Sequence, residues 1–81
     1  MKVRVQFYAQ LRDLTGIGEL DLELPEPSTV GELLEKVYAQ QPALRAHNNS
    51  ILIGAGVEFV GRDYKLKSGE QISLMPPVRG G

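Results

Sequence analysis

The chain has 81 residues, carries nine lysine or arginine against ten aspartate or glutamate residues, and contains no cysteine. This length predicts one domain with a single small core. A near-neutral charge without a basic cluster argues against a nucleic-acid partner, and the lack of cysteine excludes disulfides and thiolate metal sites. No apolar run approaches the ~20 residues of a membrane span, and there is no signal peptide, so we expect a soluble, cytoplasmic protein.

The N-terminal quarter of the sequence predicts two strands. Apolar and polar residues alternate over residues 2–8, which is typical of a half-buried strand. A short helical turn over residues 9–15 should follow, stopped by Gly16. Leucines alternate with acidic residues over positions 20–24, and Pro25 should end this second strand. Two strands so close in sequence should pair as a hairpin.

The start of the main helix is predicted by a capping sequence. Thr29-Val30-Gly31-Glu32 fits a capping box, in which Thr29 is the N-cap and Glu32 is the third helical residue. Pro42 should end the helix, because proline disrupts an interior turn. The helix then carries one apolar stripe at helical spacing, formed by Val30, Leu33, Leu34, Val37 and Tyr38.

The second half of the sequence predicts short strands separated by turns. Residues 43–49 should form a loop or a short second helix, and residues 51–53 a short strand. We interpret Gly54-Ala55-Gly56 as a turn or bulge, because a phosphate-binding loop would need a Lys-Ser/Thr ending and a following helix. Residues 57–60 form another short strand or the far side of that turn, and residues 71–75 form the last strand. One helix against one mixed sheet defines an α+β fold class.

These elements predict a domain over residues 1–75 and an extended tail over residues 76–81. The expected core consists of the inward apolar residues of the strands and the helix. They are Val3, Val5, Phe7, Leu22, Val30, Leu33, Leu34, Val37, Ile53, Ile72 and Leu74.

The tail consists of Pro76, Pro77, Val78, Arg79, Gly80 and Gly81. The two prolines lack a backbone N–H, so the last strand must stop before them. The chain beyond Met75 can reach at most roughly 20 Å at about 3.3 Å per residue. A frayed terminus is the simpler interpretation of such an end. However, two glycines without side chains suit the threading of a carboxylate through a narrow channel of another protein.

The backbone carboxylate of Gly81 is the best candidate for chemistry in this chain. His47 is the only histidine and stands in a polar loop, so neither a catalytic triad nor a metal site can be assembled around it. A carboxylate is ionised at neutral pH and is a poor electrophile. Its use requires activation by a partner, typically as an acyl-adenylate made from ATP. The protein would then be the substrate of an acyl transfer and not the enzyme.

Four stretches of the chain carry a resemblance to a known family. They are residues 5–16, residues 29–34, residues 66–72 and the Pro-Pro-x-x-Gly-Gly ending at 76–81. Over its whole length the chain is similar to the small subunit of molybdopterin synthase, in the MoaD/ThiS group of β-grasp sulfur carriers related to ubiquitin. The sequence departs from that pattern at Met75, where the family often has an aromatic residue, and at 54–56, where it often has Asn-Gly.

The resemblance implies a fold and a mechanism. The fold is a ubiquitin-like β-grasp, with a mixed sheet packed on one main helix. An E1-like adenylyltransferase would use ATP to adenylate Gly81, and a sulfur donor protein would convert it to a thiocarboxylate. The large subunit of molybdopterin synthase, in a heterotetramer, would transfer the sulfur to cyclic pyranopterin monophosphate in molybdenum cofactor biosynthesis. The small subunit would bind no cofactor or metal, and the catalytic side chains would belong to the large subunit.

A partner surface is expected beside the tail. Tyr8 and Met75 point to the opposite face from Phe7 and Leu74, and they lie side by side if the first and last strands are neighbours. Phe59 is the third expected member, by resemblance to the interface of the family. Exposed apolar side chains clustered in this way mark an interface, whereas the simpler alternative is a minor second core under a loop.

Two other functions remain open from the sequence. One is a related carrier that delivers sulfur to tRNA thiolation or to thiamin or cysteine synthesis, or a ubiquitin-like protein modifier. The other is a β-grasp binding module without terminal chemistry. Pro76 and Pro77 favour the molybdopterin synthase subunit over both.

Overall fold

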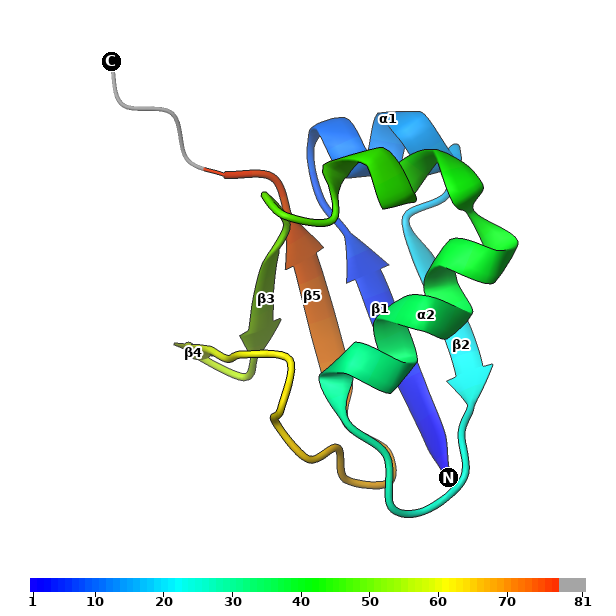
Figure 1. Cartoon of the computed structure of the whole chain (residues 1–81), viewed down its shortest axis with the longest axis vertical. Coiled ribbons are helices and arrows are strands. Elements are labelled where there is room, and N and C mark those ends of the chain that lie inside the picture. The colour runs from blue at the N-terminus through cyan, green and yellow to red at the C-terminus, as the bar shows by residue number, and fades with distance from the viewer. Residues whose placement is uncertain (78–81) are drawn as a thin grey trace.

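The structure is a computed structural model that describes residues 1–77. The expectations for Val78, Arg79, Gly80 and Gly81 lie outside the described residues. The elements are β1 (Lys2–Phe7), α1 (Gln10–Thr15), β2 (Glu19–Glu23), α2 (Val30–Gln40), the 3₁₀ helix η1 (Pro42–His47), β3 (Leu52–Ala55), β4 (Glu58–Phe59) and β5 (Gln71–Met75) (Figure 1).

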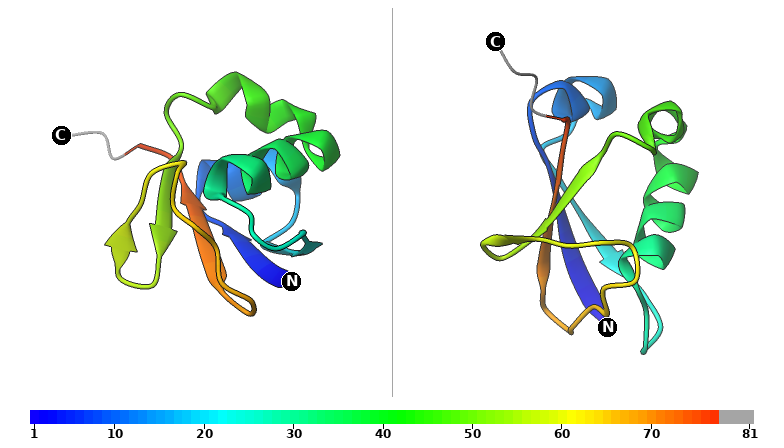
Figure 2. Two further views of the ribbon diagram at one scale, coloured as in Figure 1. Left: turned by 60° about the horizontal axis from the view of Figure 1, so that its bottom comes forward. Right: turned by 60° about the vertical axis from the view of Figure 1, so that its left-hand side comes forward.

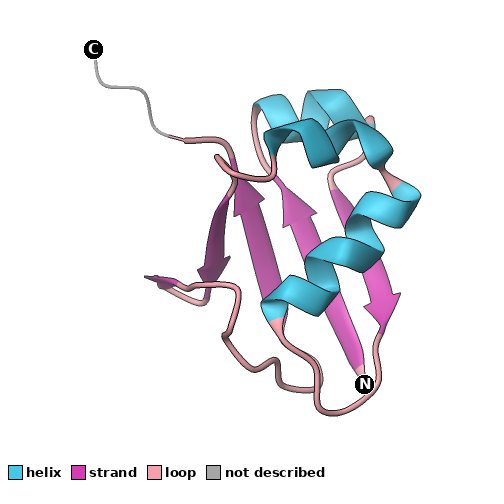
Figure 3. Cartoon of the chain, in the orientation of Figure 1, coloured by secondary structure: helices cyan, strands magenta, loops and turns pink. Residues whose placement is uncertain are grey.

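The strands form one five-stranded mixed sheet in the order β2-β1-β5-β3-β4 (Figure 3). Its two central strands, β1 and β5, run parallel, and every other pair is antiparallel. Helix α2 covers one face of the sheet, and none of the described residues forms a helix over the other face (Figure 2). This is the β-grasp arrangement, so the predicted α+β fold class with one main helix is confirmed.

The first hairpin follows the predicted alternation. Val3 pairs with Leu22 and Val5 with Leu20 across β1 and β2, so the apolar residues of both strands face α2. The polar residues between them occupy the opposite face. A one-residue slip would exchange the two faces, so the burial of the valines fixes this register.

The capping box of α2 is present as predicted. The Thr29 hydroxyl accepts a hydrogen bond from the Glu32 N–H at 3.3 Å, and the Glu32 carboxylate accepts one from the Thr29 N–H at 3.0 Å. The N–H groups of Val30 and Gly31 donate to backbone carbonyls of the loop at positions 62 and 64. The first turn of the helix is therefore satisfied by both its own cap and a distant loop.

The core contains all eleven residues expected from the sequence, and each is at most 4% exposed. It also contains six apolar residues that were not in the expected set, among them the Tyr38 of the predicted helical stripe. Burial raises the pKa of the Tyr38 hydroxyl, which donates to Asn48 Oδ1 at 2.7 Å. The six are Leu11, Leu24, Tyr38, Leu44, Ile51 and Leu66.

The interpretation of Gly54-Ala55-Gly56 as a turn or bulge needs correction. Gly54 and Ala55 belong to β3, where they pair with Ser73 and Ile72 of β5 and with Phe59 and Glu58 of β4. Only Gly56 makes the turn, with a positive φ of 64°. The glycine at 54 permits a close approach of a neighbouring side chain rather than a change of chain direction.

Because α2 supplies the centre of the core, truncating its inward face should be costly. Leu33→Ala or Leu34→Ala, at 0% and 1% exposure, should each lower the free energy of unfolding by roughly 2–5 kcal/mol. Thermal and denaturant unfolding would measure the loss. Gln40→Ala, at an exposed position of the same helix, is the matched control and should change stability little. Unchanged midpoints for both leucine variants would show that this packing of the helix is wrong.

Candidate functional site

The parallel pairing of β1 and β5 places the ends of both strands at one edge of the sheet. Phe7 pairs with Leu74, and the Tyr8 N–H, just past β1, donates to the Leu74 carbonyl at 3.1 Å. Strand β5 ends at Met75, as predicted from the two prolines that follow. The root of the tail and Tyr8 therefore lie at the edge where β1 and β5 end side by side (Figure 1).

An apolar patch, formed by Tyr8, Val57, Phe59 and Met75, occupies the open face of the sheet beside this edge. Together with Gly54, Gly56, Glu58 and Ser73 these residues line a hollow of about 240 Å³. Phe59 is 69% exposed and Tyr8 is 44% exposed, although both are large and apolar. The structure thus brings together the three residues expected at the partner surface, Tyr8, Phe59 and Met75, and no loop within residues 1–77 covers them.

Val57 is a member of the patch that the sequence analysis missed. It is fully exposed at the tip of the β3–β4 hairpin, directly after Gly56. An apolar residue at a glycine turn has no core to enter, and this was the signal available in the sequence.

Gly54 shapes the floor of the hollow. A Cβ atom built on Gly54 would lie 3.1 Å from Met75 Cε, which is closer than an ordinary van der Waals contact. The Met75 methyl group therefore lies across the bare backbone of β3.

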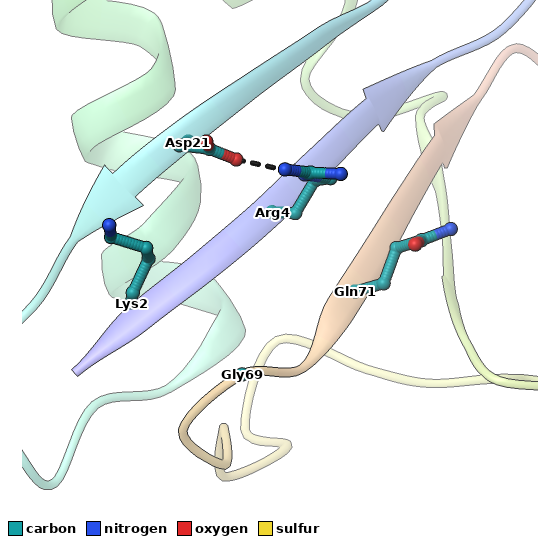
Figure 4. Close-up of a pocket in the computed structure, with 5 residues that line it drawn as sticks. All are labelled: Lys2, Arg4, Asp21, Gly69 and Gln71. Carbon is teal, nitrogen blue, oxygen red and sulfur yellow. Dashed lines mark hydrogen bonds and ion pairs between the residues drawn. The ribbon is translucent and has the colours of Figure 1, made fainter.

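The other half of the open face is polar and internally paired. Arg4 Nε lies 3.0 Å from Asp21 Oδ1 (Figure 4). It also lies 3.6 Å from Glu19 Oε2. The hydrogen bond and the charge of Arg4 lower the pKa of the Asp21 carboxyl, and the carboxylate in turn raises the pKa of Arg4. Lys2, Gly69 and Gln71 complete a hollow of about 210 Å³ here. Since Arg4 already has acidic partners within the chain, this region offers less to a binding partner than the apolar patch.

The tail root borders a further hollow of about 360 Å³. Pro76 and Pro77 line it together with Ala9, Gln10, His47 and Ser50. Within residues 1–77, no three histidine, cysteine, aspartate or glutamate side chains gather closely enough to hold a metal ion. The same part of the chain has no helix long and apolar enough to cross a membrane. The chemistry predicted for Gly81 lies outside the described residues.

The fold and the site define a small β-grasp protein with an exposed apolar patch where a glycine-ended segment leaves the sheet. The chain belongs to the ThiS family, a family of sulfur carriers, whose model matches residues 5–81. It is 29% identical over 83 residues to the molybdopterin synthase sulfur carrier subunit of Chlamydomonas reinhardtii, with all of both chains covered. It is 31% identical to the subunit of that name from Escherichia coli (strain K12), covering 98% of this chain and 99% of the relative.

Other relatives have different names. The chain is 26% identical, over the full length of both proteins, to small archaeal modifier protein 3 of Haloferax volcanii. The crystal structure of SAMP1 from Haloferax volcanii matches at a TM-score of 0.90 and 21% identity over the whole of both chains, which is a likeness of fold alone. The Amycolatopsis orientalis BexX/CysO complex matches at a TM-score of 0.73 and 27% identity, covering 98% of this chain and 99% of that one.

Substitutions in the exposed patch should affect partner binding more than the stability of the free chain. Phe59→Ala or Tyr8→Ala removes apolar surface that a partner would bury, but removes little from the core. Each variant should therefore weaken partner binding by more than it lowers the free energy of unfolding. Calorimetric titration with the partner, beside thermal unfolding of the free chain, measures both. Unchanged affinity with a lowered melting point would assign these residues to a second core.

Gly54→Ala should disturb the patch without unfolding the domain. Gly54 does not adopt a positive φ, and the atom that its new methyl group meets is the flexible end of Met75. We expect a melting point close to that of the unmodified chain and a shift of the Met75 methyl resonance in an NMR spectrum. Ala55→Gly, one residue along β3, is a control that should leave the Met75 resonance in place. An unshifted Met75 resonance in Gly54→Ala would contradict the contact described here.

Proposed function

We propose that this chain is the sulfur carrier subunit of a molybdopterin synthase. The observation that carries the proposal is the shared edge of the sheet, where the apolar patch lies next to the root of a Pro-Pro-x-x-Gly-Gly tail. A partner that covers the patch is thereby placed to receive the tail. The names of the full-length relatives from Chlamydomonas reinhardtii and Escherichia coli support the choice of this synthase.

The proposed chemistry takes place on the carboxylate of Gly81. An E1-like adenylyltransferase joins this carboxylate to the AMP part of ATP and releases pyrophosphate. Sulfide supplied by a donor protein then attacks the acyl carbon and displaces AMP, which leaves a thiocarboxylate on Gly81. The large subunit of the synthase passes this sulfur to cyclic pyranopterin monophosphate, and the terminus returns to a carboxylate. The chain itself supplies the reactive end and the docking surface, and the catalytic side chains belong to the large subunit.

The geometry suits delivery of the terminus into a partner. From Met75, the tail can reach at most roughly 20 Å at about 3.3 Å per residue. Apolar burial at Tyr8, Phe59 and Met75 would hold the domain against the large subunit while the tail enters it. The similar structure from Amycolatopsis orientalis is a BexX/CysO complex, which supports the docking of this chain on a second protein. We place the complex in the cytoplasm, as a heterotetramer of two small and two large subunits.

A second candidate function is favoured by the similarity to small archaeal modifier protein 3. In that case the activated Gly81 would be passed to an amine of another protein, or its sulfur to a different client. Both functions share the activation of Gly81 and differ only in the acceptor. An assay that follows activation and delivery separately distinguishes them.

Deletion of Gly81 tests the proposal. The purified chain is incubated with ATP, the E1-like adenylyltransferase and a sulfur donor, and then with the large subunit and cyclic pyranopterin monophosphate. The full chain should yield molybdopterin. The chain ending at Gly80 should be slower by about 100-fold or more, because small displacements of a reacting group are costly. Its melting point should not change, since position 81 follows two prolines and adds no side chain to the core.

The two steps of the assay, activation of Gly81 and formation of molybdopterin, distinguish the two candidate functions. Activation of Gly81 without any molybdopterin, in the presence of the large subunit, would assign the chain to another client. Molybdopterin formation at the normal rate by the deletion variant would show that Gly81 does not carry the sulfur.

A further inference from the structure

A second hollow adjoins the apolar patch on the other side of Tyr8. Its volume is about 170 Å³, and Tyr8 is the residue that it shares with the hollow of the patch. It is lined by Gln6, Phe7, Tyr8, Ala9, Arg12 and Gly18. A partner that covers the patch at Tyr8 would therefore lie next to this hollow.

Arg12 provides a positive charge to this hollow. Its side chain lies across Gly18, where a Cβ atom would be 3.4 Å from Arg12 Nε. Among residues 1–77, the Arg12 guanidinium forms no ion pair. This contrasts with Arg4, on the other half of the same face, which is paired with two acidic residues.

Gln6 adds a hydrogen-bond donor to this hollow, because the Tyr8 hydroxyl occupies its amide oxygen. This hydroxyl donates to Gln6 Oε1 at 2.6 Å, which leaves the amide nitrogen for other contacts. Within the described part of the chain, that nitrogen makes no hydrogen bond. Gln6 and Arg12 thus line one hollow with N–H donors, and an arginine fork matches the geometry of a carboxylate.

We propose that this hollow is a carboxylate-binding subsite, which recognises an acidic side chain of the large subunit next to an apolar side chain seated in the patch. This deepens the proposed function and rests on it. A carboxylate can accept from both Arg12 and Gln6, and its burial under the partner strengthens the charge-assisted hydrogen bonds. Apolar contact alone would leave Arg12 buried without a counter-charge, which is costly.

Charge reversal at Arg12 tests this subsite. Binding of the large subunit from the same organism is measured by calorimetry for the unmodified chain and for Arg12→Glu. The variant should bind at least about tenfold more weakly, because a charge-assisted pair is replaced by repulsion between two acids. The affinity of the unmodified chain should also fall as salt is raised, and less so for Arg12→Glu.

Two further variants separate the subsite from general effects. Lys67→Glu makes the same change of charge on an exposed side chain at the far end of the sheet, where Gly69 bonds to Lys2, and should leave the affinity unchanged. Gln6→Glu keeps the acceptor for the Tyr8 hydroxyl but replaces the donor nitrogen with an anionic oxygen, and should weaken binding. Melting points of all three variants show that the fold is intact.

Three other binding results would each overturn a particular part of the proposal. Equal affinities for Arg12→Glu and the unmodified chain would overturn the subsite while leaving the proposed function standing. An Arg12→Glu defect confined to the E1-like adenylyltransferase would show that the acidic group belongs to that enzyme and would overturn the assignment to the large subunit. If the unmodified chain does not bind the large subunit at all, the proposed function fails together with the subsite.

Discussion

The parallel pairing of β1 and β5 is the constraint on which the rest of the structure depends. These strands lie at opposite ends of the chain, and their pairing needs the long connection that contains α2, β3 and β4. Because parallel strands finish at the same edge of a sheet, Tyr8 and Met75 become neighbours there. The tail root and the donor-lined hollow lie at this edge as a consequence, and the apolar patch extends from it across β5 to the β3–β4 hairpin.

The face of the sheet under α2 stabilises the fold, and the open face presents side chains that a partner could bind. The face under α2 holds the buried apolar residues, and the loop at positions 62–64 binds the first turn of that helix. On the open face, Phe59 and Val57 remain in water although a folded monomer gains nothing from exposing them. Their exposure is understandable if a second protein covers them, whereas the Arg4–Asp21 half of the face is already satisfied within the chain.

Local patterns in the sequence were sufficient to predict the helices and strands, but they predicted the candidate functional site less completely. The alternation in β1 and β2, the capping box at Thr29 and the prolines after Met75 each act within a few residues, so they could be predicted. Gly54 was misread because its role depends on Met75, which is a cross-strand neighbour on β5 and 21 positions away in sequence. Burial of Leu44 and Leu66 likewise depends on how loops fold back on the sheet.

The members of the donor-lined hollow could not be found from the sequence for the same reason. Gln6 appeared as one more polar residue of an alternating strand, and Arg12 as an exposed residue of a short helix. Only the register of β1 and the position of Gly18 bring them to one hollow. Two members of the patch, Tyr8 and Met75, were predicted because the alternation of β1 and β5, with their assumed pairing, placed them on one face. Phe59 was expected from the family resemblance alone.

The central claim is that the chain carries sulfur on its own C-terminus. Its most direct test is mass spectrometry of the terminal fragment, after incubation with ATP, the E1-like adenylyltransferase and a sulfur donor. If Gly81 carries the sulfur, the fragment should gain the mass difference between sulfur and oxygen at Gly81 and react with a thiol-selective alkylating agent. Oxidation of Met1 or Met75 adds almost the same mass. An added mass found only on these methionines, with no alkylation of the terminal fragment, would contradict the account.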